Sequence, residues 1–247
     1  MDLQKILKDN NIQIITLANN GYLKFTYNCI KSLEKLGLTN LIKVYCADKK
    51  CYADLKNEYS NIKYIDSEYN KNISRLRRYP SQKHYTETEF KDVVFLKFVA
   101  ISDALEKSNV IFVDSDVVFL NEKFLEYLLN NIKNNEILFQ NEGLIDNTES
   151  GACSGLMYMK STSSVKNFFD PTTVIHNEHW ISNVGDQDYV NNNKEKLKYD
   201  YMDCSLFTNG RIWRKHHKKL NPYMVHFNWM KVRMKVKMMK RTGGWFL

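Results

Sequence analysis

The sequence is most informative at one apolar run, Val110-Ile111-Phe112-Val113-Asp114-Ser115-Asp116-Val117-Val118-Phe119-Leu120, which only an Asp-Ser-Asp tripeptide interrupts. Residues i and i+2 of an extended chain point to the same face, so we expect Asp114 and Asp116 to converge while Ser115 points away. Ionised carboxylates in apolar surroundings need a counter-charge or a metal, because desolvating them is costly. The run therefore predicts a buried strand that ends in a divalent-cation site. Capping of a helix that opens at residues 121–124 explains the tripeptide equally well.

The composition is that of a folded protein. Of 247 residues, 43% are hydrophobic and 13% aromatic, which argues against disorder, and a chain of this length forms one large α/β domain or two small ones. No stretch approaches the roughly 18 consecutive apolar residues of a membrane span. We see no secretory signal, and five cysteines without Cys-x-x-Cys spacing are typical of free thiols. We therefore expect a cytoplasmic protein.

The net charge of +8 favours a partner of opposite charge: nucleotide phosphates, nucleic acid, an anionic membrane or an acidic glycan. No nucleic-acid-binding motif appears, so no nucleic-acid partner is expected. Basic and apolar residues alternate with period two from Lys231 to Met238. An extended segment with this pattern presents one cationic face, to phosphate, to a membrane or simply to water. In a helix the same pattern scatters its charges, which weakens the case for a membrane anchor.

The order of the predicted elements indicates a parallel sheet. Residues 12–17 form a strand, residues 22–36 a helix capped by Gly37, and residues 41–47 a second strand. Such strand–helix–strand units build parallel sheets. A shorter unit (54–65), a long loop (69–88) and a helix (89–107) then lead into the Asp-Ser-Asp strand.

The remainder of the chain also reads as alternating helices and strands. The pattern predicts helices at 124–132 and 165–169, strands at 136–140 and 156–159, a helix with Asp186 as its N-cap, and extended segments at 198–213 and 224–229. No repeat or linker divides the chain. A single domain, residues 1–247, is the simplest organisation.

Three further polar features stand in apolar or loop surroundings. Lys97 is the one charge within residues 93–101; a solvated lysine is the plain explanation, and a lysine aimed at an anion is the alternative. Asp186-Gln187-Asp188 is a second acidic pair, of which helix capping explains one member. His226 stands near the C-terminus. Two carboxylates and one neutral imidazole suit manganese, which accepts nitrogen more readily than magnesium or calcium.

Read in order, these motifs resemble the nucleotide-diphospho-sugar transferase family, which includes plant arabinosyl- and xylosyltransferases and is more distantly related to glycogenin-like enzymes. The matching blocks are residues 15–22, 28–33, 114–118, 154–158, 185–188, 209–210 and 225–229. The resemblance implies an α/β fold of GT-A type: a single Rossmann-like domain with a central, mainly parallel mixed sheet flanked by helices. Residues 1–120 would be the nucleotide-binding half. Residues 121–247 would be the acceptor-binding half and carry His226.

The resemblance also implies a set of site residues. Asp114, Asp116 and His226 would hold Mn²⁺, with Mg²⁺ as the alternative ion, and Asp186, Gln187 and Asp188 would lie beside the transferred sugar as the catalytic group. The implied substrate-binding residues are Ala18, Asn19, Asp48, Lys97, Asp114, Ser115, Ser154, Gly155, Asn228, Lys231 and Lys235, the last two as alternatives for the diphosphate. The chain departs from the family at Cys153, where relatives often carry Asn or Gly.

The implied function is transfer of a sugar from an NDP-sugar, with UDP-sugar as the first choice, to a hydroxyl of a glycan, protein or small-molecule acceptor, with retention of configuration. Trp180, Trp213 and Trp229 are candidate stacking surfaces for an acceptor sugar, with core packing as the plain alternative. A rival enzyme is a phosphatase of the haloacid dehalogenase type, with Asp114 as its nucleophile. Its Asp-x-Asp motif normally opens the fold, whereas 113 residues precede it here. A third interpretation is a nucleotide-sugar-binding protein without catalysis.

Overall fold

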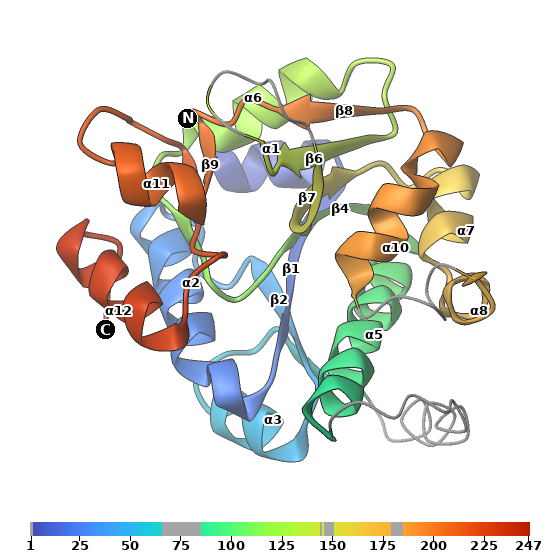
Figure 1. Ribbon diagram of the computed structural model, residues 1–247, viewed down its shortest axis with the longest axis horizontal. Helices are drawn as coiled ribbons and strands as arrows, with labels where there is room; N and C mark the ends of the chain where they lie inside the picture. The colour runs from blue at the N-terminus through green and yellow to red at the C-terminus, as the bar shows by residue number, and fades with distance from the viewer. Residues whose placement is uncertain (1, 66–84, 144, 146–150, 179–184) are drawn as a thin grey trace.

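The computed structural model describes residues 2–65, 85–143, 145, 151–178 and 185–247, without the side chains of residues 85–92. Its centre is a seven-stranded sheet of order β3-β2-β1-β4-β7-β6-β8 (Figure 1). The strands are β3 (Ile62–Tyr64), β2 (Ile42–Cys46), β1 (Ile12–Ala18), β4 (Asn109–Val113), β7 (Ala152–Met159), β6 (Ile137–Asn141) and β8 (Tyr199–Met202). β7 pairs antiparallel with β4 and β6, and the other pairings are parallel. The predicted mainly parallel mixed sheet is confirmed.

Alternating apolar residues cover both faces of this sheet, as burial on two sides requires. Ile14 packs in a core with helices α1 (Leu3–Asp9), α2 (Leu23–Lys35), α3 (Lys49–Leu55) and α6 (Lys123–Ile132). Its neighbour Ile15 packs on the opposite face with α5 (Tyr85–Leu105), α7 (Ser163–Phe169), α8 (Pro171–Ile175) and α10 (Asp186–Asn193). Figure 1 shows this second group of helices together on the right of the sheet. The fold is therefore a three-layer α/β sandwich.

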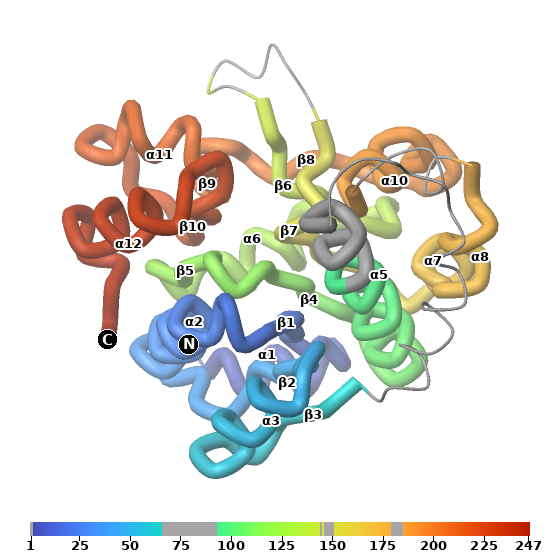
Figure 2. The backbone as a smooth tube through the Cα atoms, turned by 60° about the horizontal axis from the view of Figure 1, so that its bottom comes forward, coloured from blue at the N-terminus to red at the C-terminus, as the bar shows by residue number. Residues whose placement is uncertain are grey.

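A second, three-stranded sheet joins β5 (Val117–Phe119), β10 (Met224–His226) and β9 (Phe207–Asn209). β10 runs antiparallel to β5 and parallel to β9. The single apolar run 110–120 therefore supplies one strand to each sheet, and Asp-Ser-Asp forms the turn between them. In Figure 2, α11 (Gly210–His216) and α12 (Val232–Arg241) lie beside the small sheet, away from α5, α7 and α8.

The end of α2 follows the sequence prediction closely. Gly37 adopts φ +76°, the left-handed region that glycine enters without a steric penalty. The amide of Gly37 donates to Glu34 O (3.0 Å) and the amide of Leu38 donates to Leu33 O (3.0 Å). These two bonds form a Schellman motif, which ends the helix and turns the chain toward β2.

The structure corrects several predicted elements. Helix α1 has no predicted counterpart, and β7 begins at Ala152 rather than at residue 156. Helix α11 begins inside the segment predicted to be extended, because the Asn209 side-chain oxygen Oδ1 accepts from the amides of Arg211 and Ile212 and so caps a helix.

The C-terminal tail is helical, so of the two conformations considered for residues 231–238 the helix is the one that forms, and the single cationic face of an extended segment does not. Lys235, Met238 and Met239 are buried, at the i, i+3, i+4 spacing of one helix face. The long loop predicted at 69–88 lies mostly outside the described residues. Among the described helices, none is long and apolar enough to span a bilayer.

Candidate active site

A cavity of about 720 Å³ opens where β1 and β4 end. Ligand sites of open α/β sheets are expected at the carboxyl ends of the strands. Its lining comprises Leu17, Ala18, Asn19, Tyr22, Val93, Val94, Lys97, Asp114, Ser115, Asp116, Glu142, Cys153, Ser154, Gly155, Asp186, Gln187, His226, Asn228, Trp229 and Lys235. The cavity thus draws on both halves of the chain.

The turn between the two sheets brings the acidic pair and the histidine together. Val117 N donates to Asp114 O (3.0 Å), which closes the turn, and Phe227 N donates to Asp116 O (3.1 Å). His226 pairs with Val117 in the small sheet, so its side chain stands beside the acids. One ligand atom from each of Asp114, Asp116 and His226 lies within 4.8 Å of the others. The acids converge as predicted, although through a turn instead of an extended strand.

Hydrogen bonds fix the orientation of the His226 ring. Gln140 Nε2 donates to Phe207 O (3.1 Å), so Gln140 Oε1 faces His226 Nδ1 at 2.9 Å and accepts a hydrogen bond from the Nδ1–H group. Cys153 Sγ lies 3.5 Å from the same nitrogen. The neutral ring therefore keeps Nε2 bare on the side of the acids, which is the arrangement that metal-binding histidines use.

Each carboxylate divides its two oxygens between a lysine and the histidine. Asp114 Oδ1 pairs with Lys97 Nζ at 3.1 Å, and Asp114 Oδ2 lies 3.7 Å from His226 Nε2. Asp116 Oδ2 pairs with Lys235 Nζ, and Asp116 Oδ1 lies 3.2 Å from His226 Nε2. Asp114 Oδ2, Asp116 Oδ1 and His226 Nε2 therefore face one another. Each lysine binds the carboxylate oxygen that does not face the histidine. This donor set of two oxygens and one nitrogen fits manganese.

The charges of the cluster are mutually stabilised. Burial opposes ionisation of Asp116, but the neighbouring His226 and Lys235 outweigh it and hold the pKa of Asp116 well below its usual range. Burial disfavours the charged imidazole, yet the carboxylates of Asp116 and Asp114 raise the pKa of His226. A metal must displace the proton from Nε2, so its affinity rises with pH.

Lys97 is neither solvated nor snorkelling. It is buried, contacts Asp186 as well as Asp114, and lies 3.4 Å from Ser154 O. Burial lowers the pKa of Lys97, but the two carboxylates outweigh burial and raise it. The pKa of Asp186 is lowered in turn, because Lys97 outweighs the effect of burial. Lys97 thus links the first acidic pair to the second.

The three residues of the second acidic motif lie in the first turn of α10 and do not all face the cavity. Gly185 is the N-cap, and Asp186 is the first helical residue, so the predicted capping role of Asp186 is wrong. Asp186 and Gln187 line the cavity. Asp188 is exposed and lies outside the lining.

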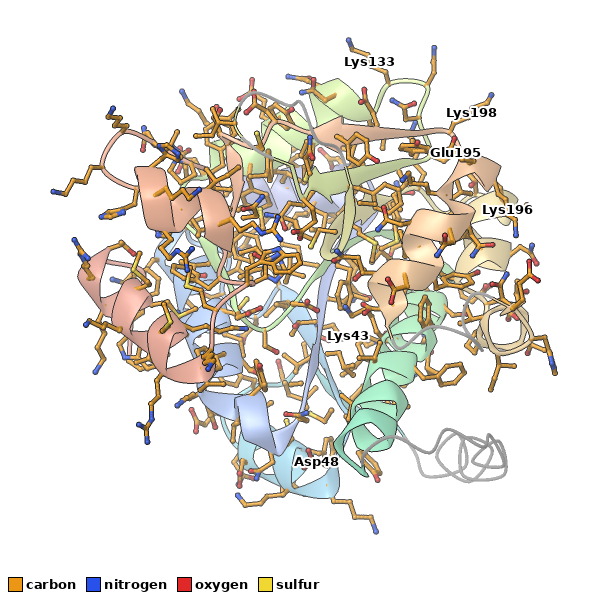
Figure 3. All side chains as sticks on the ribbon, in the orientation of Figure 1. Lys43, Asp48, Lys133, Glu195, Lys196 and Lys198 are labelled. Carbon is orange, nitrogen blue, oxygen red and sulfur yellow. The ribbon has the colours of Figure 1, made fainter. Side chains whose placement is uncertain are left out.

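Most of the predicted substrate-binding residues line the cavity, and two do not. Ala18, Asn19, Ser154, Gly155 and Lys235 line the cavity, as do Ser115 and Asn228, whereas Asp48 and Lys231 do not. Asp48 caps α3 and accepts from Asn20 N (2.7 Å), at the lower edge of the molecule in Figure 3.

Two of the predicted lining residues use their polar groups inside the protein. The Ser115 hydroxyl donates to Leu17 O (2.9 Å), so it points away from the acids as the sequence predicts. The Asn228 amide donates to Glu142 Oε1 (2.7 Å) and accepts from Gly210 N (2.8 Å).

Among the polar groups of the site, sequence reasoning missed Gln140, Glu142 and Tyr22, and it missed the contact of Cys153 with His226. Gln140 and Glu142 flank Asn141, at the end of β6, and nothing in their sequence neighbourhood marks them. A resemblance to a family identifies ligands more readily than the groups that orient them. Of the predicted stacking residues, Trp213 is buried and Trp229 is exposed at the cavity, while Trp180 lies outside the described residues.

Comparisons with known proteins identify the family of the chain. The family model for nucleotide-diphospho-sugar transferases matches residues 37–240. A UDP-galactose:fucoside alpha-3-galactosyltransferase of Dictyostelium discoideum is 21% identical over 266 aligned residues, which cover 90% of this chain. The chain spans 41% of the length of that relative.

Solved structures share the fold. The galactosyltransferase LgtC in complex with donor and acceptor sugar analogues superposes with a TM-score of 0.58 at 13% identity, covering 95% of this chain and 96% of LgtC. A glycosyltransferase involved in glycosylation of the major capsid of PBCV-1 gives a TM-score of 0.55 at 15% identity, covering 93% and 98%. These neighbours have the GT-A fold.

Proposed function

The chain belongs to the nucleotide-diphospho-sugar transferase family and is a glycosyltransferase, and from that premise we propose that it is metal-dependent and uses a UDP-sugar. The observation that carries the proposal is the convergence of Asp114 Oδ2, Asp116 Oδ1 and His226 Nε2. Neither of these two oxygens pairs with a lysine, because Lys97 and Lys235 bind the other oxygen of each carboxylate. Mn²⁺ is the ion that this donor set favours, with Mg²⁺ second.

The lysines and the cation site would stabilise the negative charge that develops during the reaction. As the bond from the anomeric carbon to the diphosphate breaks, negative charge collects on the leaving group. A metal bound by Asp114, Asp116 and His226 would neutralise that charge. Lys235 lies at the same site and reaches into the cavity, so we assign the diphosphate contact to Lys235 rather than to Lys231.

Each half of the chain would bind one of the two substrates. The nucleotide would lie along the end of β1, at Ala18 and Asn19, within residues 1–120. The acceptor would approach over residues 121–247, which also supply His226. The Dictyostelium relative is named for UDP-galactose, so UDP-galactose is the first donor to test.

We infer retention of anomeric configuration from the family. Asp186 is neutralised by Lys97, and Asp188 lies outside the cavity, so neither acid of the second pair is a free carboxylate at the cavity wall. Gln187 is the member of that motif left to contact the transferred sugar through neutral hydrogen bonds. The anomeric form of the product, assigned by NMR, tests this inference.

We further propose that α11 and α12 contact an anionic membrane. Ten of their basic residues and adjoining loop lysines are exposed: Arg211, Arg214, Lys215, Lys218, Lys219, Lys231, Arg233, Lys237, Lys240 and Arg241. Val232 and Met234 are exposed among them. The helical form of α12 spreads these charges around the helix axis, so they form a broad basic surface with α11 and no single cationic face. Lys235 is not available to a membrane, because it is buried against Asp116.

The experiment that tests the proposed function is a donor panel. Purified protein with Mn²⁺ is incubated with UDP- and GDP-sugars, and release of the nucleotide is measured with and without EDTA. We expect UDP release from a UDP-sugar that requires the metal. Tight donor binding without any turnover would favour the non-catalytic binder, and phosphate release from sugar phosphates that Asp114→Asn abolishes would favour the phosphatase.

A further inference from the structure

Trp229 is an unusual residue at the mouth of the cavity. Its backbone has φ +56°, in the left-handed region where bulky side chains are rare. Its side chain lines the cavity and is 52% exposed. Trp213, by contrast, is 5% exposed and packs in a core with Phe25 and Met239. Core packing therefore explains Trp213 and leaves Trp229 unexplained.

The exposed indole is nevertheless held in place. Trp229 Nε1 donates to Glu142 Oε2, while Glu142 Oε1 accepts from Asn228 Nδ2 (2.7 Å). The Arg211 guanidinium lies over the ring, 4.0 Å from its centroid. One carboxylate thus fixes the edge of the ring and one cation covers a face. Because half of the side chain is still exposed, the remaining surface is available to a ligand.

The location of the ring separates it from the proposed nucleotide wall. Glu142 directly follows β6, and Ala18 ends β1. Two strands, β4 and β7, lie between β6 and β1 in the sheet, which corresponds to about 14 Å at about 4.8 Å per strand. The acid–histidine cluster lies between these walls, since Asp114 follows β4 and His226 contacts Gln140 of β6. A nucleotide that reaches the cluster from Ala18 leaves Trp229 on the far side.

We propose that Trp229 is the stacking platform for the acceptor, and that the acceptor presents a pyranose or similar sugar ring. A fixed aromatic face binds the apolar C–H face of a sugar, and charged groups at its edge bind the hydroxyls. Glu142 lies at the edge of the ring, and Arg211 lies over the face that the sugar would leave free. The inference rests on the proposed function, because it takes the opposite wall to hold the donor nucleotide.

Trp229→Gly removes the ring without straining the backbone, since glycine adopts the left-handed conformation freely. Met234→Ala is the matched control: Met234 is an exposed apolar side chain of α12 that does not line the cavity. Binding of the methyl glycosides of glucose, galactose and xylose is measured by saturation-transfer NMR, with UDP and Mn²⁺ present. The Kd of UDP is measured in parallel.

We expect Trp229→Gly to weaken glycoside binding at least tenfold while the Kd of UDP changes less than twofold, and Trp229→Phe to restore part of the loss. Met234→Ala should match the wild type in both measurements. Three results would overturn the platform: unchanged glycoside binding in Trp229→Gly, absence of glycoside binding by the wild type, or a tenfold weaker UDP affinity in Trp229→Gly, which would assign the ring to the nucleotide. Failure of the proposed function looks different, because the wild type itself would then not bind UDP.

Discussion

Gly155 packs so closely against the acid–histidine cluster that no larger residue fits. It lies in β7 opposite Asp114, whose amide donates to Gly155 O (2.7 Å). A Cβ at this position would clash with Asp114 Oδ2 and His226 Cε1. The ligand atoms can converge only because this residue has no side chain.

Gly155→Ala should therefore weaken Mn²⁺ binding at least tenfold, because the carboxylate and the ring must move apart. Gly151→Ala is the matched control, since a Cβ there meets Glu142 Cβ at an ordinary 3.6 Å. Titration of free Mn²⁺ by electron paramagnetic resonance measures both variants. Equal Mn²⁺ affinities in the two variants would contradict the placement of the metal beside Gly155.

Gln140 is a positioning residue, since it acts through His226. Gln140→Leu removes the acceptor for Nδ1–H and should release the ring to its other tautomer, with a 10- to 100-fold loss of Mn²⁺ affinity. Gln140→Glu keeps an acceptor and should retain more affinity than Gln140→Leu. The ¹⁵N shifts of the imidazole report the tautomer directly, so a ring unchanged in Gln140→Leu would refute this role.

The sequence identified the three residues of the acid–histidine cluster more readily than the residues that orient them, for a physical reason. Asp114, Asp116 and His226 are polar residues in apolar surroundings, and burial of such groups demands a partner. Gln140 and Glu142 acquire their roles only when β6 pairs with β7 and the small sheet brings His226 and Trp229 to them, which no local pattern specifies.

At the scale of elements, Asp103 fastens α5 to the edge of the large sheet. Its carboxylate accepts from Tyr45 Oη (2.6 Å) and Lys43 Nζ (3.3 Å) of β2, and from Lys63 Nζ (2.7 Å) of β3. Burial alone would raise its pKa, but these donors outweigh it and lower the pKa of Asp103 to about 2. Burial lowers the pKa of Lys43, which offsets part of the gain.

Asp103→Asn should lower the free energy of unfolding by about 1 kcal/mol at pH 7, since a pKa unit corresponds to about 1.4 kcal/mol and part of the effect is offset. The folded-state pKa lies below the unfolded value of about 3.9, so the stabilisation is present above pH 4 and disappears as the pH falls toward 2. Urea unfolding at several pH values measures this. Asp9→Asn, in an exposed pair with Lys5, is the control and should change nothing; a pH-independent Asp103→Asn effect would contradict the account.

Element prediction succeeded where burial and periodicity agree, as in β1, α2 and β4. The periodicity left the conformation of α12 open, because its alternating sequence is typical of a strand. The buried face of the helix includes a charged residue, Lys235, and Lys235 is buried there because it pairs with Asp116. A contact 119 residues away in sequence therefore overrides the local pattern.

Over the whole molecule, positive charge is concentrated at one end of the chain. The full sequence has 36 Lys and Arg against 28 Asp and Glu. Residues 204–247 contain eleven of the basic residues and none of the acidic ones, which leaves 25 basic and 28 acidic residues in the rest. The net charge thus belongs to α11, α12 and their flanking segments.

This asymmetry predicts salt-sensitive binding to vesicles of phosphatidylcholine with one-fifth phosphatidylserine, because each basic residue near such a surface contributes about 1 kcal/mol. Lys237→Glu with Lys240→Glu should weaken binding at least tenfold in a sedimentation assay. Lys133→Glu with Lys196→Glu changes the net charge equally on the side away from α11 and α12 (Figure 3) and should have little effect. Equal losses in both double variants would indicate net charge alone.

We propose that two carboxylates and a histidine hold a metal that binds the donor nucleotide. Isothermal titration of UDP into the wild type and Asp116→Asn, each with Mn²⁺ and with EDTA, tests it most directly. We predict UDP binding to the wild type with Mn²⁺ and a loss of at least about 100-fold with EDTA or with Asp116→Asn. UDP binding of equal strength in EDTA, or in Asp116→Asn with Mn²⁺, would contradict the account.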